Sequence, residues 1–194
     1  VARFTGLSQD YVERANLRPE IMHFCKELLR DRRRTVGRLD SRYTGVDRDA
    51  TGGEIATDPS FGAVMGPYTA TLNDYVRGEL QFESDLPYEI LSFKTNEAWR
   101  FEHDNRFVEV VESLRKAMTM NPFLKVFVAN GYFDLATPYS ATEYTFRHLG
   151  LPAELQGNVE MAYYEAGHMM YVHQPSLAKL GKDLAGFVRA TLPA

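Results

Sequence analysis

The sequence predicts an α/β protein with a parallel sheet in its second half, and three observations support this fold class. Residues 105–194 alternate between amphipathic stretches at helical spacing and short, nearly continuous apolar runs. Short links join these stretches, as is typical of crossover helices between parallel strands. Asp134 and His168 each follow one of the two apolar runs, and ligand sites of parallel sheets lie at the carboxyl ends of the strands.

The second half begins with a helix and a strand. Apolar residues recur at helical spacing across residues 107–118, which predicts an amphipathic helix. Asn121-Pro122 is expected to end this helix, because proline disrupts helical hydrogen bonding. Residues 124–129 are almost continuously apolar. Such a run predicts a parallel strand that is buried on both faces.

A helix, a second strand and a last helix complete this half. Thr137 is the expected N-cap of the first of these helices, Pro138 suits its first turn, and Gly150 is its expected C-cap. Apolar and polar residues alternate across residues 159–164, which predicts the second strand. Pro175 opens the last helix, which carries an apolar stripe along one face.

Residues 1–104 are predicted to form a mainly helical cap or insertion ahead of the last strands of the sheet. Ser8 can cap a short helix, and residues 21–29 have the apolar spacing of a second one. Residues 44–66 are rich in glycine and turn-forming residues. Residues 68–80 indicate a further helix. No repeating β–α unit is evident in this half of the sequence.

Composition limits the classes of function. The chain of 194 residues has a net charge of −4, which argues against nucleic acid as a main partner because phosphate binding favours a basic surface. No apolar run approaches the roughly 20 residues that span a bilayer, so no membrane is expected as a partner. The single cysteine, Cys25, excludes a disulfide scaffold and is expected to be buried. His168 and His173 do not share a helical face, and neither a metal nor another cofactor is expected.

Asp134 and His168 are the candidate catalytic residues. In hydrolases whose nucleophile is followed by an acid and then by a histidine, the acid and the base have this order and this placement after strands. An imidazole can take the proton of a serine hydroxyl and return it to the leaving group. The aspartate would accept a hydrogen bond from the other ring nitrogen and fix the tautomer. Gly167 is expected to allow a tight turn that aims the imidazole.

No serine has the surroundings of an activated nucleophile. The strained nucleophile elbow requires Gly-x-Ser-x-Gly, whereas Gly6-Leu7-Ser8 is followed by glutamine and aspartate. The other serines fit the elbow no better: Ser41, Ser60, Ser84, Ser92, Ser113, Ser140 and Ser176. We therefore expect the C-terminal part of a hydrolase, either the smaller chain of a cleaved enzyme or a truncated fragment, whose nucleophile lies in an upstream chain or segment.

Three segments resemble the serine carboxypeptidase family. Residues 128–134, Val-Ala-Asn-Gly-Tyr-Phe-Asp, with Thr-Pro at 137–138, resemble its acid segment. Residues 164–169, Tyr-Glu-Ala-Gly-His-Met, with Gln-Pro at 174–175, resemble its histidine segment, and this is the most specific match. Residues 35–45, Thr-Val-Gly-Arg-Leu-Asp-Ser-Arg-Tyr-Thr-Gly, resemble bacterial members. The resemblance spans most of the chain and is strongest in the second half.

This resemblance implies an α/β-hydrolase fold with a helical cap, in which residues 105–194 carry the last strands. It also implies release of C-terminal residues from a peptide substrate, often best at acidic pH, and a periplasmic or secreted location. By position, Met169 resembles the residue that lines the pocket for the departing amino acid, and plain core packing is the alternative. Residues 170–173, Met-Tyr-Val-His, depart from the commoner Met-Val-Pro continuation.

Other functions remain open at this point. The chain could be a non-catalytic binding module that keeps the last strands of the fold, or part of an acyltransferase or esterase with the same triad. Residues 8–34 could form a helix-turn-helix with a basic end, but Asp31 interrupts the arginines and the chain is acidic. An open edge at the strand of residues 124–129 predicts pairing with another chain or self-association.

Overall fold

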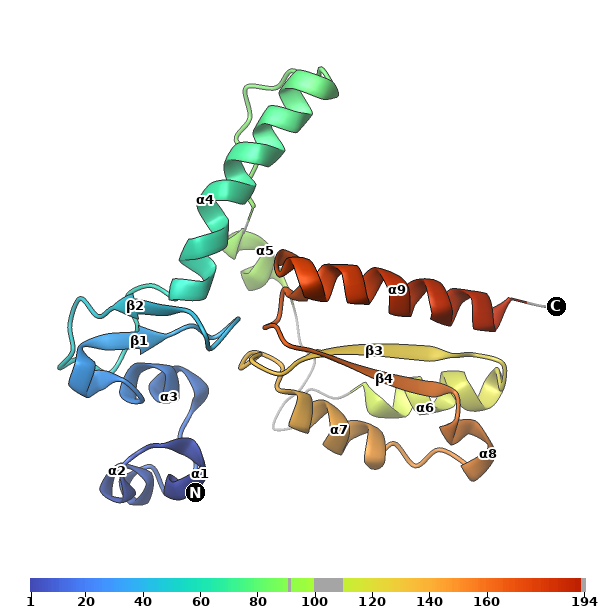
Figure 1. The fold of residues 1–194 in the computed structure, drawn as a ribbon, viewed down its shortest axis with the longest axis horizontal. Coiled ribbons are helices and arrows are strands. Elements are labelled where there is room, and N and C mark those ends of the chain that lie inside the picture. The colour runs from blue at the N-terminus through green and yellow to red at the C-terminus, as the bar shows by residue number, and fades with distance from the viewer. Residues whose placement is uncertain (91, 100–109, 193–194) are drawn as a thin grey trace.

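The structure, a computed structural model, describes residues 1–90, 92–99 and 110–192. It combines helices with two small sheets, one antiparallel and one parallel. Figure 1 shows a C-terminal part built on the parallel sheet, an N-terminal part beside it, and one long helix that projects away from both. The predicted boundary between residues 104 and 105 and the predicted helix start at Phe107 lie outside the described residues.

Two parallel strands form the centre of the C-terminal part, as predicted. β3 spans Val126–Gly131 and β4 spans Val159–Tyr164, and they pair in parallel along their whole length. Both strands therefore end at the same edge of the sheet. The prediction that the first strand is buried on both faces is wrong, since Ala129 is exposed.

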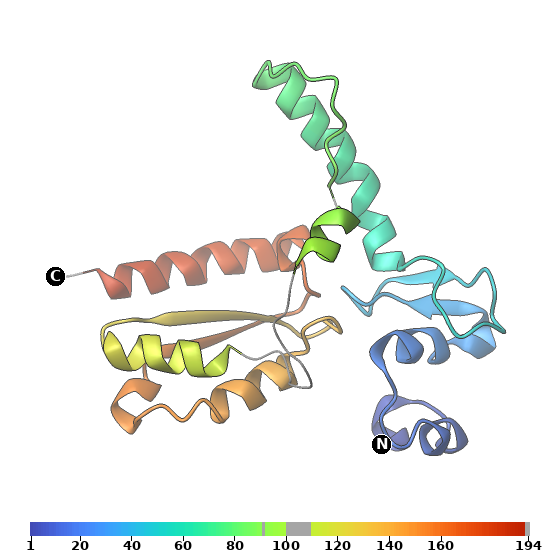
Figure 2. The same cartoon turned by 180° about the vertical axis from the view of Figure 1, so that it is seen from behind.

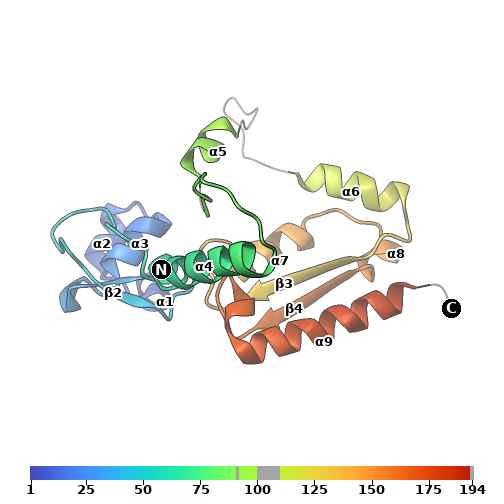
Figure 3. The same ribbon diagram turned by 90° about the horizontal axis from the view of Figure 1, so that it is seen from above.

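Helices lie on both faces of this sheet. The helical segments of the C-terminal part are α6 (Val111–Met120), α7 (Tyr139–Arg147), α8 (Ala153–Gln156), the 3₁₀ turn η3 (Met170–Val172) and α9 (Gln174–Thr191). α9 runs along one face, and α7 lies on the opposite face (Figures 1 and 3). Part of the predicted apolar stripe of the last helix packs on the sheet: Leu180 contacts the core, and the rings of Phe127 and Phe187 lie 5.4 Å apart between centroids. Leu177 and Leu184, also predicted for this stripe, are exposed.

Two predictions about the ends of α7 are wrong. Thr137 is not its N-cap, because α7 begins after Pro138 without a side-chain cap, and the Thr137 hydroxyl donates to Asp134 instead. The helix ends at Arg147 and its C-cap is His148, two residues before Gly150. Gly150 adopts a φ of 68° in the turn that follows, a left-handed conformation that favours glycine.

The N-terminal part contains short helices and an antiparallel strand pair. Its elements are α1 (Ala2–Thr5), α2 (Gln9–Arg14), α3 (Ile21–Glu27), the 3₁₀ turn η1 (Arg30–Arg32), β1 (Arg34–Val36) and β2 (Thr44–Val46). The Ser8 hydroxyl caps α2, as predicted, by accepting a hydrogen bond from the Tyr11 amide at 3.1 Å. Cys25 is fully buried, also as predicted. The strand pair was not predicted, because three-residue strands are too short to show an alternating pattern.

The projecting helix is α4, Pro59–Asp74, and it continues into a π-helical turn, η2, Tyr75–Glu79. Figure 2 shows that it points away from both sheets, with the short helix α5, Phe93–Ala98, near its base. The predicted helix at residues 68–80 is therefore present. The prediction of turns across residues 44–66 is wrong in part, because this stretch includes β2 and the first residues of α4. Among the helices that the structure describes, none is long and apolar enough to cross a membrane.

A buried lysine joins α3 to the loop after β2. The Lys26 side chain is 1% exposed, and its ammonium donates to Asp47 Oδ1 at 2.7 Å and to the carbonyl of Asp49. The other carboxylate oxygen of Asp47 is buried without a hydrogen-bond partner among the described residues. Oδ1 also accepts from the Asp49 amide at 3.2 Å, and the Lys26 ammonium is the cation that pairs the Asp47 charge. A buried charge is costly unless it is paired.

We expect Lys26→Met to lower the free energy of unfolding by about 3–5 kcal/mol, since it leaves Asp47 buried and unpaired. Urea unfolding followed by circular dichroism measures this change. The control Lys182→Met removes an exposed ammonium from α9 and should change stability by less than about 0.5 kcal/mol. Wild-type stability of Lys26→Met would contradict the assigned role.

Candidate active site

The loop after β3 holds the Asp134 carboxylate with several hydrogen bonds. Oδ1 accepts from the amides of Ala136 at 2.7 Å and Thr137 at 2.9 Å. Oδ2 accepts from the Thr137 hydroxyl at 2.7 Å. Asparagine and aspartate commonly organise turns in this way, through hydrogen bonds to amides two and three residues on. The side chain is 5% exposed, so the turn presents the carboxylate in one orientation.

His168 meets this carboxylate from the loop after β4. Its Nδ1 lies 2.8 Å from Asp134 Oδ2 and 3.2 Å from the Thr137 hydroxyl. An ionised carboxylate can only accept, so Nδ1 is the protonated nitrogen in this contact. The imidazole is 43% exposed, while the carboxylate behind it is buried. Nε2 has no hydrogen-bond partner among the described residues.

Burial and hydrogen bonding act in opposite directions on Asp134. Desolvation raises the pKa of its carboxyl group, while hydrogen bonds from the Thr137 hydroxyl and amide and from His168 lower it. The net effect holds the pKa of Asp134 below its ordinary value. The carboxylate is therefore ionised at neutral pH, which is the form that can orient a histidine and stabilise its protonated state.

Close backbone contacts bring the two loops together. The amides of Tyr132 and Phe133 donate to the carbonyls of Tyr164 and Ala166, at 3.0 Å each, which extends the parallel pairing beyond the strands. A Cβ atom on Gly131 would lie only 2.3 Å from the carbonyl oxygen of the glycine before His168. Glycine at this position thus lets two loops touch. These are the loop after β3, which carries Asp134 (the acid loop), and the loop after β4, which carries His168 (the histidine loop).

Gly167 serves a similar purpose, which differs from the predicted one. Its φ is not in the positive region, so the turn itself does not require glycine. A Cβ atom there would lie 2.3 Å from the carbonyl oxygen of Leu39 and 2.4 Å from Cβ of Asp40. The glycine is needed for the close approach of the segment between β1 and β2. Sequence reasoning missed this contact because it joins residues more than a hundred positions apart.

Met169 packs against the N-terminal part. It is half-buried and lines a space of about 20 Å³ with Leu39, Tyr43 and Val64. A space of this size holds about one water molecule. In this arrangement Met169 has the contacts of a packing residue, and the space beside it is too small for the side chain of a departing amino acid.

The serines with hydrogen-bonded hydroxyls near this region face other groups. The hydroxyl of Ser60 donates to Asp58 and accepts from the amide of Leu39. The hydroxyl of Ser176 lies 2.8 Å from Nδ1 of His173, at the start of α9. Both serines are buried. Neither is placed as the nucleophile of His168, in agreement with their sequence context.

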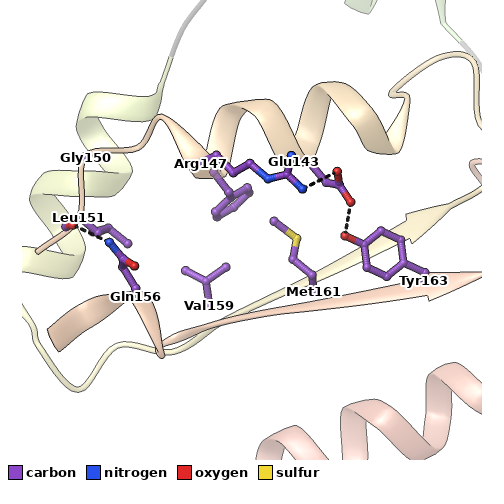
Figure 4. A pocket seen from close by; sticks show the side chains of 9 residues that line it. Glu143, Arg147, Gly150, Leu151, Gln156, Val159, Met161 and Tyr163 are labelled. Carbon is purple, nitrogen blue, oxygen red and sulfur yellow. Dashed lines mark hydrogen bonds and ion pairs between the residues drawn. The ribbon is translucent and has the colours of Figure 1, made fainter. Parts of the chain in front are cut away.

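A larger cavity, which sequence reasoning did not find, lies away from the candidate pair. It has a volume of about 430 Å³ and opens between α7, α8 and β4 (Figure 4). Phe146, Val159 and Met161 give it apolar walls. At one end, Glu143 accepts a hydrogen bond from the Tyr163 hydroxyl at 2.7 Å. Neither member of the candidate catalytic pair lines this cavity.

We expect Gly167→Ala to destabilise the protein by about 1–3 kcal/mol, because the new methyl group overlaps backbone atoms that are held in place. Chemical denaturation measures the change. Gly186→Ala is the matched control, since its Cβ would meet nothing within 4 Å in α9, and it should raise stability by about 0.5–1 kcal/mol. Equal effects of the two substitutions would contradict the close contact.

The depressed pKa of Asp134 predicts a pH dependence. A carboxyl group with a lowered folded-state pKa stabilises the protein above its unfolded pKa, and this stabilisation is lost as pH falls through the folded pKa. The stability difference between wild type and Asp134→Asn should therefore shrink as the pH falls below about 4. Urea titrations over this range test it, and a difference that is independent of pH would contradict it.

In the described ranges, no cluster of three or more histidine, cysteine, aspartate or glutamate side chains is arranged to hold a metal ion. No protein-family model, curated protein or solved structure matches this chain. The contact between Asp134 and His168 is therefore the feature of this chain that points to a function.

Proposed function

We propose that this chain supplies the acid and the base of a serine carboxypeptidase, a hydrolase that releases C-terminal residues from peptides. One observation carries the proposal: the buried carboxylate of Asp134 lies 2.8 Å from Nδ1 of a half-exposed His168. The order of the two residues in the chain, their positions after neighbouring parallel strands, and the resemblance of the surrounding segments support it.

Each residue has a defined role in this proposal. Nε2 of His168 takes the proton of the serine hydroxyl as the oxygen attacks the scissile carbonyl. The imidazolium then gives this proton to the leaving amine. Asp134 holds the Nδ1–H tautomer and stabilises the positive charge on the ring. Proton transfer of this kind contributes roughly 10² to 10⁴ to the rate.

The nucleophile and the oxyanion hole of this enzyme would lie outside residues 1–194. The hydroxyls of Ser60 and Ser176 are engaged elsewhere, and no serine in the sequence has the glycines of a nucleophile elbow. In the same proposal, β3 and β4 are the last strands of an α/β-hydrolase sheet, and residues 1–104 form its cap. The upstream part would complete the sheet beside these strands.

A binding module is the second candidate, and the cavity between α7 and β4 favours it. Its volume of about 430 Å³ lies in the range of small-molecule sites. Apolar walls beside the Glu143–Arg147 ion pair suit a ligand with an apolar body and a charged group. Binding of the fluorescent probe anilinonaphthalene sulfonate, and its loss in Met161→Trp, would support this candidate. Equal binding by the variant would contradict it.

We expect His168→Ala, in the enzyme that carries the nucleophile, to lower kcat by about 10³ to 10⁶ while peptide binding survives. Release of C-terminal amino acids from a peptide measures turnover. The control is His148→Ala, which removes an exposed imidazole at the end of α7 and should leave kcat near wild type. Turnover of His168→Ala near the wild-type value would refute the proposal.

Residues 1–194 alone should release no amino acid, because the base has no hydroxyl to activate.

A further inference from the structure

The segment between β1 and β2, residues 38–42, hydrogen-bonds to both loops of the candidate site. The carbonyl of Leu39 accepts from the amide of His168 at 2.7 Å, one of the shorter contacts of this region. The carbonyl of Arg38 accepts from the amide of Leu135 at 3.0 Å, directly after the acid. Figure 1 shows this segment reaching the C-terminal ends of β3 and β4. It therefore binds the backbone beside both candidate residues.

Arg42 adds a side-chain link between the same two loops. Its Nη1 donates to the carbonyl of Glu165 at 2.9 Å, in the histidine loop. Its guanidinium lies 4.7 Å from the ring centre of Phe133, in the acid loop, a distance at which cation–π attraction operates. Arg42 thus contacts one residue near each member of the pair, and neither Asp134 nor His168 itself.

Asp40 fixes the orientation of this guanidinium. Its carboxylate accepts from Nε of Arg42 at 3.0 Å and from Nη2 at 2.7 Å. The carboxylate is 9% exposed and the arginine side chain 37%. Two parallel hydrogen bonds between an arginine and a carboxylate are strong and set the geometry of the fork. One face of the guanidinium is therefore directed at the acid loop and one nitrogen at the histidine loop.

We propose that Arg42, held by Asp40, is a positioning residue that keeps the imidazole of His168 on the carboxylate of Asp134. Its role in catalysis rests on the proposed function, because positioning affects turnover only if the pair is catalytic. Without Arg42, the carbonyl of Glu165 and the ring of Phe133 lose their common partner. A misplacement of about 1 Å in a catalytic group can lower a rate by about 10².

Proton NMR of the chain of residues 1–194 tests the positioning role directly. A proton shared between an imidazole nitrogen and a carboxylate gives a far-downfield signal, and its exchange with water reports how firmly the contact is held. In Arg42→Ala we expect exchange of the His168 Nδ1 proton and of the His168 amide to accelerate by about tenfold or more. Arg42→Lys should not restore slow exchange, because an ammonium lacks the two-pronged fork.

Arg14→Ala is the matched control. Arg14 lies on α2 in an exposed ion pair with Asp10, and its removal should leave both exchange rates unchanged. The double variant Asp40→Asn with Arg42→Gln removes the buried charge together with its partner, so it tests the same link if Arg42→Ala does not fold. Wild-type exchange of the Nδ1 proton in either folded variant would overturn the proposal.

The exchange rates in these variants do not depend on whether the protein hydrolyses peptides. The NMR signal requires only the contact between Asp134 and His168, and no nucleophile or substrate. Faster exchange in Arg42→Ala would establish positioning even if the complete protein released no amino acid from peptides. In an active enzyme, Arg42→Ala should lower kcat by about 10² with little change in KM. An unchanged kcat would show that the link does not serve catalysis.

Discussion

Asp134 and His168 meet because three backbone segments approach one another more closely than a side chain would permit. A Cβ on Gly131 or Gly167 would lie within 2.3 Å of a carbonyl oxygen of a neighbouring segment. The amides that this packing encloses are paired across the segments, including the amide of His168 with the carbonyl of Leu39. Buried amides require such partners, so the contact of acid and base follows from the packing around it.

The parallel sheet determines where this packing occurs. β3 and β4 end together, and the pairing continues through Tyr132 and Phe133 into the loops that carry the acid and the base. The segment from the N-terminal part then closes over both loops. The candidate site is consequently shared between two regions of the chain, and the segment of residues 38–42 contributes to it as directly as the strands do.

The sequence was sufficient to predict the parts of this arrangement that depend on local patterns. Apolar periodicity identified both parallel strands and α9, and the position of Asp134 and His168 after the strands predicted their contact. Patterns could not reveal which segment lies over Gly167, because that contact joins residues 39 and 167. The Thr137 hydroxyl also escaped prediction. A helix cap would accept a hydrogen bond from a helix amide, whereas here the Thr137 hydroxyl donates to Asp134 Oδ2 and α7 begins after Pro138 without a side-chain cap.

The cavity between α7 and β4 was equally beyond a sequence argument. Its walls come from alternate residues of one strand and from one face of a helix, and these are the positions that normally pack against each other. The cavity exists because α7 and β4 stand apart in space. Periodicity predicts which face of an element is apolar, but it does not predict how far two such faces stand apart.

The tautomer of His168 tests the central claim most directly, and long-range ¹⁵N–¹H correlation spectra of the imidazole measure it. The hydrogen bond from Nδ1 to Asp134 predicts that the neutral ring carries its proton on Nδ1 and leaves Nε2 free to act as a base. In Asp134→Asn this preference should weaken. A neutral ring that carries its proton on Nε2 in the wild-type chain would contradict the account.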